Sequence, residues 1–201
     1  MVYVGNRYLT LEEMKVNAQY ILNWFTSRGW SKQAVCGMLG YMQTESTINP
    51  GIWEGLQEGN LNVGFGLVQW TPASKYINWA VDNGYPITDI NGQCQRIIYE
   101  LENGLQYYPT PQYPMMFREF SVSTESPEYL AQVFLINYER PLNPNQPQRS
   151  TQARYWFDLL VPGGDPGGPG EPGEPGEPVP IPSGEPKDLI HLLLAGTLNG
   201  W

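Results

Sequence analysis

The sequence predicts a mainly α-helical domain over residues 1–162, with one small β element between its second and third helices. Apolar residues recur at intervals of three and four through most of this range, which is the spacing of a buried helix face. Residues that favour helix starts and stops bound the periodic segments. After Val161 the composition changes abruptly to glycine, proline and glutamate, so the folded domain is expected to end there.

The first two helices have the clearest boundaries. Thr10 and Glu13 form the Thr-x-x-Glu pattern of a capping box, and Gly29 provides a stop. Ser31 is a preferred N-cap residue and predicts the start of the second helix. Both helices are expected to pack into the core. The inward stripe of the second helix consists of Val35, Met38, Leu39 and Met42.

The β element and the later helices are marked mainly by glycine and proline. Residues 62–70, NVGFGLVQW, contain two glycines and predict a short hairpin or a tight turn. Thr71-Pro72 opens a third helix in the preferred cap-then-proline order, and Gly84 closes it. The proline- and tyrosine-rich segment 106–116 predicts an irregular, ordered loop. Three further helices are predicted over residues 89–105, 126–138 and 148–160.

Composition excludes several classes of function. The net charge is −9, with an acidic excess in both parts of the chain, so nucleic acid is not an expected partner. No apolar run reaches the roughly 18 residues that span a bilayer. His191 is the single histidine, which excludes zinc hydrolases with several histidine ligands and a histidine-based triad in the folded domain. We expect no metal and no cofactor. Cys36 and Cys94 fall at apolar helix positions, which favours buried free thiols over a disulfide.

The C-terminal part of the chain divides into a linker and a short helix. From Gly164 the sequence runs through five triplets, GDP-GGP-GEP-GEP-GEP, with glycine at every third place. This period is collagen-like, but five triplets favour an extended acidic linker over residues 163–186 rather than a triple helix. Residues 187–201, KDLIHLLLAGTLNGW, predict a short apolar helix. Because it is too short to cross a bilayer, docking to a partner protein is its favoured use.

Glu45 is the candidate catalytic residue. The apolar stripe of the second helix reaches position 45 at its next step, so a carboxyl group stands where an apolar side chain is due. Burial and the negative end of the helix dipole both favour a protonated carboxyl group there. A glycosidase needs such a group to protonate the departing glycosidic oxygen. The alternative is that the helix frays by position 44 and Glu45 faces water, and spacing alone does not decide between the two.

The β element after Glu45 can form one wall of a groove. Gln69 can hydrogen-bond a sugar amide or hydroxyl group, and Trp70 can stack on a sugar face. For any single aromatic residue, core packing is the ordinary alternative.

Two motifs carry a family resemblance. ESTINP over residues 45–50, followed by GFGLVQW over residues 64–70, resembles the signature of goose-type lysozymes and lytic transglycosylases. Residues 1–160 as a whole resemble the tail-associated lysozymes of small tailed phages, most closely the tail-tip peptidoglycan-degrading proteins of short-tailed Bacillus phages. The segments that carry this wider resemblance are KVNAQYILNWF, GFGLVQWTPAS, NYERPLNPNQP and KDLIHLLLAGTLNGW.

The resemblance implies a lysozyme-like fold and a set of roles. Glu45 matches the family's catalytic acid, Gln69 a glutamine that lines the substrate groove, and Tyr138 an active-site tyrosine. Glu54 and Glu58 are possible second carboxylates that activate a water, with solvated loop charge as the alternative for both. Relatives also work without a second carboxylate, through the substrate's own N-acetyl group. We expect cleavage between N-acetylmuramic acid and N-acetylglucosamine, by hydrolysis or by transglycosylation.

The resemblance also implies a location. We expect a virion protein at the tail tip, attached to a tail knob or tube protein through residues 187–201 and acting on the host cell wall. A zinc endopeptidase domain, frequent in such relatives, has no counterpart in this sequence. Two alternatives remain: an inactive wall-binding tail module, and a soluble endolysin released at host lysis. Glu45 in its full motif argues against the first, and the linker with its terminal helix argues against the second.

Overall fold

Seven α-helices form the framework of residues 1–167, the part of the chain that the computed structural model describes. They are α1 Leu11–Thr26, α2 Lys32–Ser46, α3 Ser74–Asp82, α4 Ile90–Glu102, α5 Phe117–Val122, α6 Pro127–Phe134 and α7 Gln148–Leu159. A 3-10 turn (η1, Glu54–Leu56) and a π-helical turn (η2, Leu135–Glu139) complete them. The prediction of a mainly α-helical domain is confirmed. The linker from residue 168 and the predicted helix over 187–201 lie outside the described residues.

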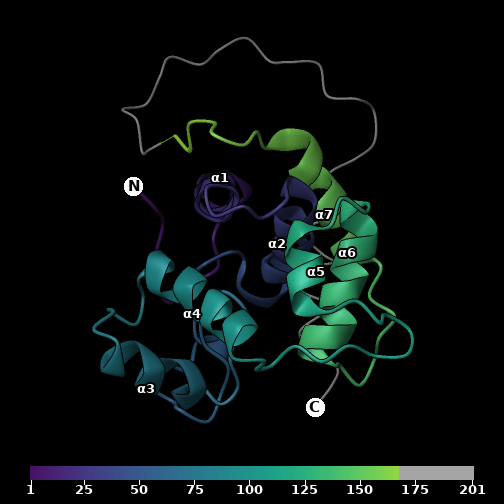
Figure 1. Cartoon of the computed structure of the whole chain (residues 1–201). Coiled ribbons are helices and arrows are strands. Elements are labelled where there is room, and N and C mark those ends of the chain that lie inside the picture. Colours follow the sequence, from purple (N-terminus) through teal and green to yellow (C-terminus); the bar gives the residue numbers. More distant parts are fainter. Residues whose placement is uncertain (168–201) are drawn as a thin grey trace, which may run out of the picture. The chain divides into compact units, whose positions relative to one another are not determined.

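Helix α2 is the centre of the domain. It packs against α1 on one side and against α5, α6 and α7 on the other (Figure 1). Helices α3 and α4 pack against each other, and α4 also contacts α1. Two glycines allow this close packing. A Cβ atom at Gly37 would lie 3.0 Å from Leu130 of α6, and one at Gly40 would lie 2.3 Å from the Arg149 carbonyl oxygen of α7. All four residues of the predicted inward stripe are fully buried.

The predicted helix starts are confirmed at α1 and α2. The Thr10 hydroxyl accepts the Glu13 amide at 3.4 Å, and the Glu13 carboxylate accepts the Thr10 amide at 2.9 Å, which completes the capping box. The Ser31 hydroxyl accepts the Ala34 amide at 3.1 Å. Helix α3 starts at Ser74, later than predicted, and the Ala73 amide before it is bound to the Val63 carbonyl in the preceding loop.

The segment between α2 and α3 is a loop rather than a hairpin of regular strands. Within residues 1–167 its β character is limited to two isolated antiparallel bridges, Trp53 with Phe65 and Phe65 with Trp70. Hydrogen bonds from a side chain of α4 hold the loop in place of a regular β-ladder. Gln93 donates to the Pro50 carbonyl at 2.6 Å and accepts the Leu67 amide at 2.7 Å. The loop is therefore tied to a helix on one side of the molecule.

Residues after the last helix remain bound to the first. Asn23 of α1 accepts the Gly163 amide and donates to the Gly164 carbonyl, at 2.9 and 2.8 Å. Cys36 and Cys94 are free and buried, as predicted. None of the helices in residues 1–167 combines the length and the apolar character needed to cross a membrane.

Candidate active site

Glu45 lies in the last turn of α2, at the edge of the core. The helix continues to Ser46, whose hydroxyl donates to the Met42 and Leu67 carbonyls, so the helix does not fray at position 44. The sequence left open whether the Glu45 side chain is buried or faces water. In the structure it is 21% exposed, which lies between the two. Its carboxyl group is therefore held by a regular helix while part of it reaches solvent.

Arg149, in the first turn of α7, binds Glu45 directly. Its Nη2 atom donates to Glu45 Oε1 at 2.5 Å, although the arginine itself is only 4% exposed. The same guanidinium group donates through Nε to Gln146 Oε1 at 2.7 Å and through Nη1 to the Tyr41 carbonyl at 3.3 Å. It also lies 4.6 Å from the centre of the Tyr41 ring. These contacts fix both the arginine and the glutamate oxygen that it binds.

A second carboxyl group, Glu139, belongs to the same cluster. It stands at the end of η2, and its Oε2 atom accepts a hydrogen bond from the Tyr41 hydroxyl at 2.6 Å. Burial, and next the charge of Glu45, raise the pKa of Glu139, while the Tyr41 hydrogen bond and the charge of Arg149 act in the opposite direction. Burial also raises the pKa of Tyr41 well above its usual value, so Tyr41 remains a hydrogen-bond donor.

Each of these two carboxyl groups keeps one oxygen free. Among residues 1–167, Glu45 Oε2 and Glu139 Oε1 accept no hydrogen bond, and neither is a buried atom without a partner. Both oxygens therefore reach solvent, while the other oxygen of each group is held in place. The cluster joins α2, η2 and α7, and can offer two oriented carboxyl oxygens to a ligand or to water.

Glu54 and Glu58, the two loop residues named as possible second carboxylates, lie in other surroundings than Glu45. Glu54 accepts the Gly64 amide through Oε2 at 2.7 Å, and the backbone amide of Glu54 donates to the Gly64 carbonyl. Its carboxyl group thus closes the loop. Glu58 is exposed and its side chain makes no hydrogen bond within residues 1–167. The structure brings neither of them into the hydrogen-bonded cluster around Glu45.

Of the three residues expected to contact substrate, Gln69 alone keeps exposed surface. It is partly buried and donates to the Gly66 carbonyl at 2.9 Å. Trp70 and Tyr138 are 3% and 1% exposed, and both donate to the carboxylate of Glu100, at 2.8 and 2.6 Å. Tyr138 thus faces the core, and the next residue, Glu139, has the side chain that lies in the cluster.

Glu100 is a buried anchor that the sequence did not indicate. It is 1% exposed and also accepts a bond from Arg96 at 3.0 Å. Burial raises the pKa of Glu100, opposed by its three donors. Because these donors come from α4, the 62–70 loop and η2, Glu100 fixes the turn that carries Glu139.

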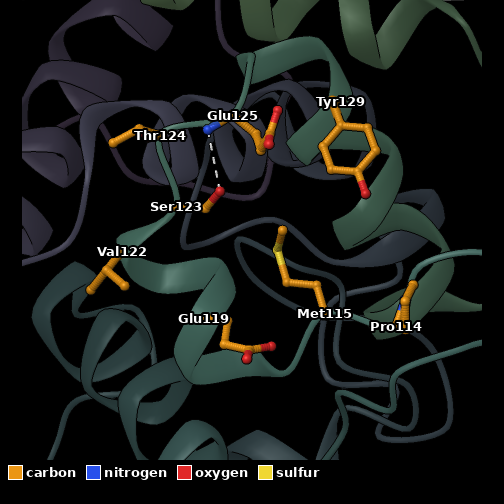
Figure 2. Close-up of a pocket in the computed structure, with 8 residues that line it drawn as sticks. All are labelled: Pro114, Met115, Glu119, Val122, Ser123, Thr124, Glu125 and Tyr129. Atoms are coloured by element: carbon orange, nitrogen blue, oxygen red, sulfur yellow. Dashed lines mark hydrogen bonds between the residues drawn. The ribbon is translucent and has the colours of Figure 1, made fainter.

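A separate pocket of about 530 Å³ lies between the segment before α5, α5 itself and α6. Figure 2 shows its lining residues, among them Glu119 and Tyr129, and none of the residues of the Glu45 cluster. The Glu119 carboxylate accepts the Met116 amide at 2.8 Å and so serves as a helix cap. The pocket therefore adds no group to the candidate active site.

Comparison with known proteins places the chain in a family. Residues 16–160 match the family model described as phage tail lysozyme. Morphogenesis protein 1 of Bacillus phage B103 is 56% identical over 167 residues, which are 83% of this chain and 45% of that protein. The chain thus spans less than half the length of this curated relative. Since the match covers most of the helical domain, the chain belongs to the phage tail lysozyme family.

Proposed function

We propose that this chain is a cell-wall glycosidase of a phage tail, and that it cleaves the bond between N-acetylmuramic acid and N-acetylglucosamine in peptidoglycan. The observation that carries the proposal is the geometry of Glu45. Its carboxyl group stands at the end of a buried helix, with one oxygen held by Arg149 and the other open. In a lysozyme family, a carboxyl group of this kind is suited to general acid catalysis.

Glu45 would act through its open oxygen. Arg149 occupies Oε1, so the proton for the departing glycosidic oxygen resides on Oε2. Gln69, partly exposed in the neighbouring loop, would hydrogen-bond the sugar, whereas Trp70 and Tyr138 support the site from the core.

The test uses purified peptidoglycan and the full chain. We expect release of soluble glycan fragments, identified by mass spectrometry. Reducing muramic acid ends would indicate hydrolysis, and anhydromuramic ends would indicate transglycosylation; both support cleavage of this bond. Glu45→Gln should abolish release from a chain that is still folded by far-UV circular dichroism, with a melting temperature several degrees lower because the pair with Arg149 is weakened. Glu12→Gln, an exposed carboxylate of α1, is the matched control and should retain full activity.

Two outcomes would contradict the proposal. An active Glu45→Gln protein would remove Glu45 from the chemistry. A wild-type chain that binds walls but releases nothing would instead be a wall-binding tail module.

We also propose that residues 187–201 attach the enzyme to a tail knob or tube protein. The support is their short apolar sequence and the name of the B103 relative, morphogenesis protein 1. Phage particles assembled with a chain that ends at residue 186 should lack the enzyme on immunoblots, while that chain should still cleave purified walls. Normal incorporation of the shortened chain would refute the attachment. Absence of the wild-type chain from particles would favour an endolysin.

A further inference from the structure

The carboxyl group of Glu139 is connected to that of Glu45 through two intervening side chains. Tyr41 lies one helical turn before Glu45 on α2 and donates its hydroxyl proton to Glu139 at 2.6 Å. The guanidinium group of Arg149 lies over the Tyr41 ring and binds Glu45. Two acids, one phenol and one cation are thus held together at a partly exposed site.

We propose that Glu139 is the second catalytic carboxyl group of this enzyme, and that it activates the water that attacks the sugar. This inference rests on the proposed function. Glu139 accepts the Tyr41 hydroxyl, Arg149 binds Glu45 and lies over the Tyr41 ring, and Glu139 still has an open oxygen. One carboxyl oxygen of Glu54 accepts the Gly64 amide, and the exposed Glu58 makes no hydrogen bond with the cluster.

The charge of Glu45 bears on the pKa of Glu139. Burial raises the pKa of Glu139 and the charge of Glu45 raises it further, so a proton on Glu45 would remove the second of these effects and favour ionisation of Glu139. The Tyr41 hydrogen bond and the positive charge of Arg149 then stabilise the Glu139 carboxylate. Arg140, the other nearby charge, donates to the Gln106 and Asn137 carbonyls. The state with Glu45 protonated and Glu139 ionised is the one that acid–base hydrolysis requires.

The proposed step balances in atoms and protons. Glu45 gives its proton to the glycosidic oxygen as the bond from that oxygen to the anomeric carbon breaks. Glu139 takes one proton from water, whose oxygen forms the new bond to the same carbon. The products are two sugar ends with one water added, and an enzyme with its proton on Glu139. Exchange of one proton with solvent restores the starting state.

The decisive variants are Glu139→Gln and Glu139→Asp in the full chain, assayed on purified peptidoglycan. We expect Glu139→Gln to lower kcat about 100-fold or more, the usual scale for loss of a general base, with little change in KM. It should also remove the acidic limb of the pH–rate profile, where the base becomes protonated. Glu139→Asp should recover part of the rate. Glu54→Gln and Glu58→Gln should stay within a few-fold of wild type, as should the Glu12→Gln control.

A second measurement does not depend on activity. Carbon-detected NMR titration of the Glu139 carboxyl group should give a lower pKa in Glu45→Gln than in wild type, because the repelling charge is gone. An unchanged Glu139 titration would overturn the coupling, even if Glu139→Gln failed to fold.

The outcomes separate this inference from the proposed function. If wild type cleaves walls and Glu45→Gln does not, a Glu139→Gln protein with near-wild-type kcat would refute the inference alone. Anhydromuramic products would do the same, since that route uses no activated water. If wild type cleaves no wall at all, the proposed function fails first, and the inference with it.

Discussion

Replacing Arg149 by methionine removes three hydrogen bonds from a side chain that is 4% exposed. The guanidinium group is charged, so its bonds to Glu45 and to the amide oxygen of Gln146 are both charge-assisted and each contribute about 1.5–3 kcal/mol. The bond to the Tyr41 carbonyl is long at 3.3 Å and adds little. Methionine keeps the apolar stem against the Tyr41 ring, which offsets part of the loss. The expected decrease in the free energy of unfolding is about 3 kcal/mol, the lower end of the range for a broken buried ion pair.

The lower end applies because Glu45 is 21% exposed, so water can solvate the carboxylate that is left behind. For a domain of this size, about 3 kcal/mol corresponds to a fall of about 6–12 °C in melting temperature. Far-UV circular dichroism during heating, and urea titration at 25 °C, measure the two quantities.

Arg154→Met is the matched control on the same helix. Its ion pair with Glu128 is exposed on both sides, so its loss should leave the melting temperature almost unchanged. An Arg149→Met protein that melts as wild type does, or a control that is equally destabilised, would refute the reasoning. A double-mutant cycle with Glu45→Gln isolates the pair itself, and no coupling in that cycle would mean that the other contacts of Arg149 supply the stability.

Three further changes test the packing around the site. Gly40→Ala should lower the free energy of unfolding by about 1–3 kcal/mol in urea titration and reduce wall cleavage, because its Cβ would lie 2.3 Å from the Arg149 carbonyl; an unaffected protein would mean that α2 and α7 can separate freely. Ser31→Ala should lower the same quantity by about 1 kcal/mol through loss of the α2 cap; no loss would show that the cap is dispensable. Cys36 and Cys94 should react with a thiol reagent only on unfolding, since both are buried and burial raises the pKa of Cys36 to about 12; rapid reaction of the native protein would contradict their burial.

Local physics made much of the helical framework predictable. Thr10, Glu13 and Ser31 bind backbone amides within three residues of themselves, so their effect can be recognised in a short window of sequence. The apolar stripe of α2 identified its buried face, and the same stripe led to Glu45. Both features are properties of one helix, which explains why they are visible without a structure.

The features that the sequence did not show depend on contacts distant in sequence. The loop before α3 has few ladder bonds of its own and is held by Gln93, some 26 residues beyond Leu67. Helix α5 has only six residues, too few for a periodic pattern to show. Arg149 and Glu139 reach the site from 104 and 98 residues beyond the α2 residues they bind. No spacing rule links such positions. The sequence therefore pointed to Glu54 and Glu58, which are close to Glu45 in the sequence, as candidates for a second carboxylate, and neither is hydrogen-bonded to the Glu45 cluster.

The close approach of α2 and α7 connects the stability of the fold to the proposed chemistry. Gly40 has no side chain, so the backbone of Arg149 can lie directly against α2, and from there the guanidinium group reaches Glu45. Glu100 holds η2 through its hydrogen bond with Tyr138, and the next residue of η2, Glu139, accepts the Tyr41 hydroxyl. The two acids therefore stand on different elements that the core itself holds in register. A change that loosens either contact should alter catalysis before it unfolds the domain, because a displacement of about 1 Å already disturbs a catalytic geometry.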